Sequence, residues 1–453
     1  MTAWLYLGMV LLIVIVMFIV LKRPMYEAMV IAFLALVITS GNIGKLGYYL
    51  LDTSENYLLY TMMAFMMFGI IVEKSGIIND LLEIIVAVVG RFSGGAGYVA
   101  LLAGAAMGSV CGTGSGTVAA TGTFMIPAMK KTGFTAELAA SITAAAGTLG
   151  PVIPPSAAIP VMYMMLEVAA PGYCTASQFW MFAWPVAFWL LIQRMITMYI
   201  LVRRHHVMPI PKEDRIPLRT ALKKGWRTLF LPAFMILPFM VDNIWHDTWI
   251  TDRIGTYGAE RFSALILLTV PCIAIVLVLL LWRQKGNVIN LRNVYHLMED
   301  GVITVAPIII MTFSGFAMGS LLTDMNLANE IVAQLQTLHI SRITVILAAP
   351  LIFTFFGMFM ESSSVYFLFG PVFIPFAISV GINPMMAAMM VNVLCNAMGQ
   401  MSPPFALCLL VAMGIAESDF KKTSVQAVWW CVSQYIVIVL MLAGWLPMFG
   451  FLK

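Results

Sequence analysis

Long apolar runs recur along the whole chain, and polar residues collect in short stretches between them. The runs of spanning length include 5–21, 25–38, 179–202, 263–282 and 425–445. A hydrocarbon core of about 30 Å requires roughly 20 residues of helix. Counting shorter and interrupted runs as well, the pattern predicts about ten to twelve spans, some of them broken. The longest polar stretch, 203–227, is too short for a soluble domain.

Composition supports this reading of the pattern. The chain of 453 residues is 61% hydrophobic and 10% charged, whereas soluble proteins are about 25% charged. The first apolar run has no basic residue before it and is followed by Lys22 and Arg23, which favours a retained helix over a cleaved signal peptide. Six scattered cysteines are predicted to pack between helices instead of forming a disulfide or metal framework. We expect an all-α integral membrane protein.

Charge is distributed unevenly between the spans. Basic residues dominate 22–23, 203–227, 283–292 and 421–422, whereas 242–260 is mainly acidic. Because basic loops tend to remain in the cytoplasm, the pattern predicts that both termini lie outside.

Two stretches repeat the same order of polar and helix-breaking residues. The copies are 248 residues apart at Ser115/Ser363 and Gly133/Gly381, and 249 apart at Gly150/Gly399, so one residue has been inserted. We therefore divide the chain into two halves, 1–202 and 228–453, joined by a basic linker at 203–227. Paired broken helices in opposite orientations are typical of inverted-repeat transporters.

Each half is predicted to contain a re-entrant hairpin followed by a broken helix. A short amphipathic stretch precedes each hairpin, at 77–92 and 327–338, and is either an interfacial arm or an ordinary connecting helix. The predicted hairpins lie at about 96–130 and 343–380, and the broken helices at about 136–168 and 384–417.

The stretch Gly108–Thr117 is too rich in glycine for a stable helix interior. A hairpin tip there would present free carbonyls and hydroxyls, which are suitable ligands for sodium. A phosphate loop is disfavoured because Val118 stands where that motif requires lysine. Close packing of helices by small residues remains a second possibility.

Three prolines between Pro151 and Pro155 must end the preceding helix. Its terminal carbonyls would attract a cation, and the start of the next helix would favour an anion. The stretch 396–405 repeats this arrangement; the alternative for either break is a structural kink. Glu361, at membrane depth, either binds sodium, relays a proton or stabilises the hairpin.

These motifs define the predicted sites. The predicted sodium ligands are Thr113, Gly114, Ser115, Thr148 and Gly150 for one site and Ser362, Ser363, Gly399, Gln400 and Ser402 for the other. The predicted substrate-binding residues are Thr117, Pro155, Ser156 and Pro404. No buried arginine is evident to hold an anion, so neutral donors and half-helix dipoles are expected to do so.

The motifs resemble the large membrane subunit of tripartite ATP-independent periplasmic (TRAP) transporters. The residues that carry the resemblance are 112–117, 126–134 and 149–156 in the first half and 357–361, 371–384 and 399–404 in the second. The resemblance implies an elevator mechanism in the bacterial inner membrane, driven by a sodium gradient. It also implies a small organic-acid substrate, a periplasmic or other extracytoplasmic binding protein and a separate small four-helix membrane subunit. Two features depart from the family: Glu361 replaces its usual Asp, and 241–261 is longer than expected.

We therefore predict a sodium-coupled secondary importer of a small organic acid. The alternative is an autonomous ion- or proton-coupled organic-anion transporter with no soluble binding protein. An intramembrane enzyme is not expected, because the spans show no clustered acids or histidine pair. Sodium is the only metal predicted, no further cofactor is expected, and no nucleic-acid module is visible.

Overall fold

The structure is a computed structural model that describes residues 3–205, 207–211, 213 and 215–451. Every regular element within these residues is a helix. The first half contains α1 (Ala3–Ile15), η1 (Val16–Val20), α2 (Met25–Thr39), η2 (Ile43–Lys45), α3 (Leu46–Glu55), α4 (Tyr57–Lys74), α5 (Ile78–Val89), α6 (Gly95–Cys111), α7 (Gly114–Lys131), α8 (Ala136–Leu149), η3 (Gly150–Val152), α9 (Ala158–Ala169) and α10 (Ala176–His205).

The second half follows the linker in a similar order. The linker contains α11 (Leu218–Gly225) and leads through η5 (Trp226–Leu229) into the second half. The second half contains α12 (Phe230–Trp245), η6 (His246–Ile250), α13 (Thr251–Gln284), α14 (Leu291–Asp324), α15 (Leu327–Thr337), α16 (Arg342–Phe359), α17 (Ser362–Ser379), α18 (Pro384–Asn392), η7 (Val393–Met398), η8 (Gly399–Met401), α19 (Leu407–Ala416) and α20 (Phe420–Ala443).

Seven helical segments of the described chain are long and apolar enough to cross a membrane. Shorter apolar helices supplement them, among them α6, α9 and α19. These belong to the first hairpin and to the two broken helices, where the sequence predicts interrupted backbone. The protein is therefore an all-α, multi-pass membrane protein.

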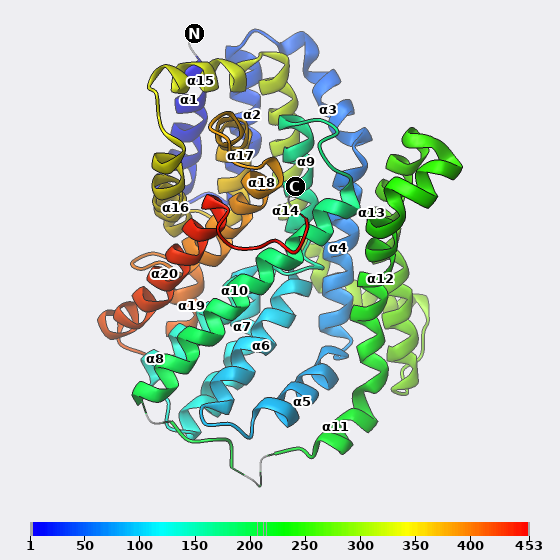
Figure 1. The fold of residues 1–453 in the computed structure, drawn as a ribbon, viewed down its shortest axis with the longest axis vertical. Coiled ribbons are helices and arrows are strands. Elements are labelled where there is room, and N and C mark those ends of the chain that lie inside the picture. The colour runs from blue at the N-terminus through cyan, green and yellow to red at the C-terminus, as the bar shows by residue number, and fades with distance from the viewer. Residues whose placement is uncertain (1–2, 206, 212, 214, 452–453) are drawn as a thin grey trace.

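The two hairpins enter the molecule from opposite ends (Figure 1). The pair α6 and α7 extends from the end where α5 and the basic linker lie, whereas α16 and α17 extend from the end marked by α15 and the N-terminus. The hairpins are thus inverted relative to each other, as the order of the repeated motifs predicts.

Matched local signals turn each hairpin into its broken helix. Gly133 and Gly381 have positive φ angles of 94° and 84°, a conformation that glycine adopts without steric cost. The Thr135 side chain then caps α8 by accepting from the backbone N–H of Leu138, and the Asn383 side chain caps α18 in the same way. These caps begin both broken helices at equivalent points.

Paired glycines bring each hairpin into backbone contact with the break beside it. A Cβ added to Gly150 would lie 2.2 Å from the Cα of Gly108, and a Cβ added to Gly399 would lie 2.8 Å from the Cα of Gly357. Both pairs are related by the same spacing of 249 residues. A side chain at these positions would separate the hairpin from the break.

The inserted residue of the second half coincides with a change of helix type. The first broken helix remains α-helical up to Leu149, whereas the second changes at Val393 to the π-helical η7. A π turn takes up one additional residue and often marks a functional site. The extra residue therefore widens the second broken helix just before its Gly-x-x-x-Pro-Pro break.

The helix before the first hairpin is tied to the rest of the molecule by charge. Asp80 of α5 is only 4% exposed, and its carboxylate forms an ion pair with the ammonium group of Lys285 at 2.8 Å. Lys224 of α11 lies 3.9 Å from the same carboxylate and also pairs with Glu83. These contacts join α5 to the end of α13 and to the linker helix.

Replacing either paired glycine tests the backbone contact. Gly150→Ala and Gly399→Ala should lower the thermal unfolding temperature of the purified protein, because overpacking typically costs roughly 1–3 kcal/mol. Gly414→Ala is the matched control, since a Cβ at Gly414 has nothing within 4 Å. Equal unfolding temperatures for all three variants would contradict the close contact.

Candidate functional site

Each hairpin tip is formed by a few extended residues between two helices. Gly112 ends α6 with a φ of 73°, Thr113 is extended, and α7 begins at Gly114. In the second hairpin, Met360 and Glu361 are extended before α17 begins. Because glycine and extended residues interrupt the helices here, the tips expose backbone and short polar side chains.

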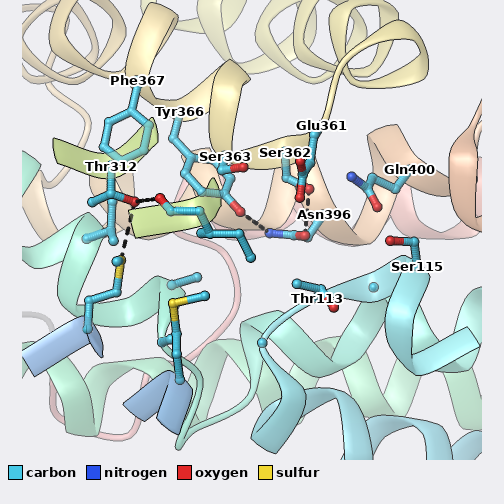
Figure 2. A pocket seen from close by; sticks show the side chains of 18 residues that line it. Thr113, Ser115, Thr312, Glu361, Ser362, Ser363, Tyr366, Phe367, Asn396 and Gln400 are labelled. Carbon is cyan, nitrogen blue, oxygen red and sulfur yellow. Dashed lines mark hydrogen bonds between the residues drawn. The ribbon is translucent and has the colours of Figure 1, made fainter. Parts of the chain in front are cut away.

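The two tips meet at one small cavity of about 40 Å³. Figure 2 shows Thr113 and Ser115 of the first hairpin facing Glu361, Ser362 and Ser363 of the second. The matched serines, 248 residues apart in sequence, therefore line the same space. The remaining wall comes from the second broken helix, through Asn396 and Gln400, and from the start of α9, at Ala157 and Ala158.

Apolar side chains of the surrounding helices cover the cavity. Met62 and Met66 of α4 and Ile308 and Thr312 of α14 complete its lining. One water needs roughly 10–15 Å³ of such space, so the cavity has room for a cation with little water. An organic acid requires the hairpin tips to move away from α4 and α14.

The chemistry of the lining suits a hard cation. Glu361 is the only carboxyl among the described lining residues, which include no lysine, arginine or histidine. Thr113 and Ser115 line the same space and bring their hydroxyls to it (Figure 2). Carboxylate, carbonyl and hydroxyl oxygens are the donors that hard cations prefer.

The predicted sodium ligands divide into two groups. Those that line the cavity are Thr113, Gly114, Ser115, Ser362, Ser363 and Gln400. The others lie outside its lining: the Thr148 hydroxyl donates to the carbonyl of Ala145 at 3.2 Å, Ser402 donates to that of Met398 at 2.7 Å, and Gly150 and Gly399 form the backbone contacts with the hairpins. The binding roles of both groups remain predictions.

None of the four predicted substrate residues lines this cavity. The Thr117 hydroxyl donates to the carbonyl of Thr113 at 2.7 Å, and the Ser156 hydroxyl accepts from the N–H of Ala158 at 3.2 Å. Pro155 lies outside the lining, and Pro404 is exposed. Their roles in substrate binding also remain predictions, although the start of α9 after Pro155 does reach the cavity.

A buried amide network beside the cavity was not anticipated from the sequence. Asn396 accepts a hydrogen bond from Ser362 at 2.7 Å and donates to the hydroxyl of Tyr366 at 2.8 Å. It also donates to Asn392 at 2.7 Å. The signal was visible, because two amides four residues apart occupy one face of an otherwise apolar helix.

The expectation that no arginine is buried within the spans is wrong. Arg194 of α10 is 0% exposed. It donates to the carbonyl of Ala397 in η7 at 2.9 Å and to the side chain of Gln434 in α20 at 2.6 Å. The guanidinium thus occupies a carbonyl of the second broken helix instead of facing the cavity, and a lone arginine within the apolar run 179–202 was the signal for it.

A larger cavity of about 870 Å³ lies beside the region that departs from the expected pattern. Its lining combines Glu167 of α9 with His246, Glu260 and Arg261 of the α12–α13 region. His246 itself contacts the buried carboxylate of Asp242 at 3.1 Å. The stretch 241–261 therefore forms a polar wall opposite α9 instead of a short loop.

Comparison with known protein families agrees with this architecture. A family model described as "Tripartite ATP-independent periplasmic transporter, DctM component" matches residues 11–448. The chain belongs to this family. It is therefore a TRAP transporter large permease, and the resemblance inferred from its hairpin motifs is confirmed.

Several curated TRAP relatives match almost the full length of the chain. The C4-dicarboxylate TRAP transporter large permease protein DctM of Pseudomonas aeruginosa is 24% identical over 412 residues, covering 91% of this chain and 90% of its own. The sialic acid TRAP transporter large permease protein SiaM of Vibrio cholerae is 22% identical, covering 90% and 89%. The 2,3-diketo-L-gulonate permease YiaN of Escherichia coli is also 22% identical, covering 82% and 81%.

Solved structures of other transporters share the fold of this TRAP permease. The YdaH transporter of Alcanivorax borkumensis has a TM-score of 0.64 at 17% identity, covering 90% of this chain and 89% of its own. MtrF of Neisseria gonorrhoeae has a TM-score of 0.65 at 13% identity, covering 90% and 86%. At this level of identity the similarity shows the arrangement of helices and nothing about the solute.

Substituting Arg194 tests its support of the second broken helix. Arg194→Met should lower the thermal unfolding temperature, because each buried acceptor left unpaired costs about 1–3 kcal/mol. Adding Gln434→Leu should restore part of the loss, since both partners of one bond are then apolar. Arg203→Met, at the exposed end of α10, is the control and should have little effect. A stable Arg194→Met protein would contradict this role.

Proposed function

We propose that this TRAP permease is the sodium-coupled large subunit of an importer of small organic acids, and that it works by an elevator movement. The observation that carries the proposal is the cavity at which the two inverted hairpin tips meet. Its size, its oxygen donors and its single carboxyl favour a cation. Family membership supports transport of organic acids, and the solute itself is beyond what the fold determines.

In this proposal the cation is held mainly by the hairpin tips. Thr113, Ser115 and Ser363 supply hydroxyls, and Gly114 leaves room for the ion because it has no side chain. Glu361 supplies the only formal negative charge at the cavity among the described lining residues. A longer Glu in place of the family's usual Asp extends the carboxyl further toward the first hairpin.

The organic acid is proposed to bind next to the cation, at the start of α9. The first N–H groups of a helix favour an anion. Ala157 and Ala158 at this helix start line the cavity, and the N–H of Ala158, which donates to the Ser156 hydroxyl at 3.2 Å, would exchange that partner for the acid. A bound cation would add a further attraction for the acid. Because Arg194 is engaged with backbone elsewhere, these neutral donors remain the principal anion-binding groups.

The position of the cavity supports the proposed elevator movement. Most polar residues of the lining belong to α6–α9 and α16–α19, which we call the carrier unit, whereas α4 and α14 contribute three apolar residues and Thr312. Sliding the carrier unit past these helices would uncover the site at one end of the molecule and then at the other. Inverted repeats make the two end states equivalent in packing.

The proposed system has three proteins: two subunits in the bacterial inner membrane and one binding protein outside it. The permease is expected to work with a small four-helix membrane subunit and an extracytoplasmic substrate-binding protein. Both termini are proposed to lie outside, because the basic linker at 203–227 lies at the opposite end of the molecule from the N-terminus (Figure 1).

Uptake in proteoliposomes tests the coupling. The permease, its small subunit and its binding protein would be assayed with radiolabelled C4-dicarboxylates and sialic acid, with and without an inward sodium gradient. Uptake is expected only with the gradient and the loaded binding protein. Undiminished uptake without sodium would refute the coupling, and equal uptake without the binding protein would favour an autonomous transporter.

Removal of a tip hydroxyl tests the site. Ser115→Ala and Ser363→Ala should each raise the sodium concentration for half-maximal uptake about tenfold, since bonds to charged groups are worth about 1.5–3 kcal/mol. Thr123→Ala is the control, because that exposed hydroxyl bonds within α7 to the carbonyl of Ala120. Unchanged sodium dependence in both serine variants would refute the assignment.

A further inference from the structure

A continuous row of hydrogen bonds connects the second hairpin tip with the first broken helix. The Ser362 hydroxyl donates to Asn396 at 2.7 Å, Asn396 donates to Asn392 at 2.7 Å, and Asn392 donates to the backbone carbonyl of Pro151 at 3.0 Å. Pro151 belongs to the break of the first half. The row therefore crosses between the two inverted repeats, and Figure 2 shows its beginning at Ser362 and Asn396.

Each member of this row is buried and oriented by its neighbours. Asn392 is 0% exposed, and Ser362 and Asn396 are each 3% exposed. Both N–H groups of the Asn396 amide are engaged, one by Asn392 and the other by Tyr366. All bonds from Ser362 to Pro151 point the same way, so they polarise one another in a low-dielectric interior.

In the first half, the residues equivalent to Tyr366 and Asn396 contact each other by apolar packing. Val118 is the counterpart of Tyr366 at a spacing of 248, and Gly147 is the counterpart of Asn396 at a spacing of 249. A Cβ on Gly147 would lie 2.5 Å from the Val118 side chain. At these positions the first hairpin packs on its broken helix through Val118 and Gly147, whereas the second is joined to its broken helix by hydrogen bonds. The two tips are therefore held by different kinds of contact.

We propose that Asn392 and Asn396 are positioning residues that link the second hairpin tip to the first break, so that both tips respond to sodium as one unit. This inference rests on the proposed sodium site. Asn396 sets the position of Ser362 at the cavity, and Asn392 sets the orientation of Asn396 through the Pro151 carbonyl. Loss of Asn392 leaves both hairpins intact but separates their responses.

Asn392 is the better test position because it does not line the cavity, whereas Asn396 does. Asn392→Leu keeps the size of the side chain and removes both bonds. Asn392→Ser is smaller and polar, and it serves as a second variant where the leucine protein does not fold. Thr143→Val is the control, because that buried hydroxyl in α8 bonds only to the carbonyl of Ala139 in its own helix.

The measurement is hydrogen exchange of the full-length chain in lipid nanodiscs, titrated with sodium chloride against choline chloride. Peptides covering 109–117 and 359–367 report on the two tips separately. In the wild type and in Thr143→Val, both tips should gain protection at the same sodium concentration. In the Asn392 variants the gain of protection at 359–367 in saturating sodium should fall about fivefold or more relative to the gain at 109–117, because the second tip loses its support.

The outcomes separate this inference from the proposed function. Equal gains of protection at the two tips in both folded Asn392 variants would overturn the linkage and leave the sodium site standing. Absence of sodium protection at either tip of the wild type would overturn the sodium site, and the linkage with it. A loss of overall stability changes the protection of both peptides together, so a merely structural role would not produce unequal gains at the two tips.

Discussion

Backbone contact between two pairs of glycines is the constraint on which the rest of this structure depends. Helices that stop inside a membrane leave carbonyls and N–H groups that must be buried in protein or face a polar cavity. Gly108 against Gly150 and Gly357 against Gly399 bring each hairpin so close to its break that no side chain fits between them. The interrupted backbone is thereby enclosed, and both tips are held at the depth where they meet.

The two halves share a similar backbone but carry different charged side chains. The hairpin tips place one carboxyl, that of Glu361, among hydroxyl and carbonyl oxygens at the cavity. The second broken helix is widened by its π turn, and its Ala397 carbonyl accepts a hydrogen bond from the buried guanidinium of Arg194. A fixed positive charge thus supports the second break from behind, while the negative charge faces the cavity. Inverted repeats of similar backbone have become unequal through a few polar side chains.

The fold tolerates wide variation in sequence and in solute. Large permeases whose names specify C4-dicarboxylates, sialic acid and 2,3-diketo-L-gulonate are all 22–24% identical to this chain. Transporters outside these relatives keep the same arrangement at 13–17% identity. The arrangement of helices therefore does not by itself determine the solute.

Local signals in the sequence were sufficient to predict the membrane class, the inverted halves, the hairpins and the breaks. These features depend on apolar run length and on glycine and proline, whose effects on the backbone do not require knowledge of distant neighbours. Tertiary structure alone decided which polar groups share the cavity. It grouped Thr113 and Ser115 with Glu361 and Ser363, left Thr148, Ser402 and Pro404 outside, and revealed the burial of Arg194 and the row from Ser362 to Pro151. Such groupings follow from how two halves about 250 residues apart pack together, and spacing along one chain does not contain that information.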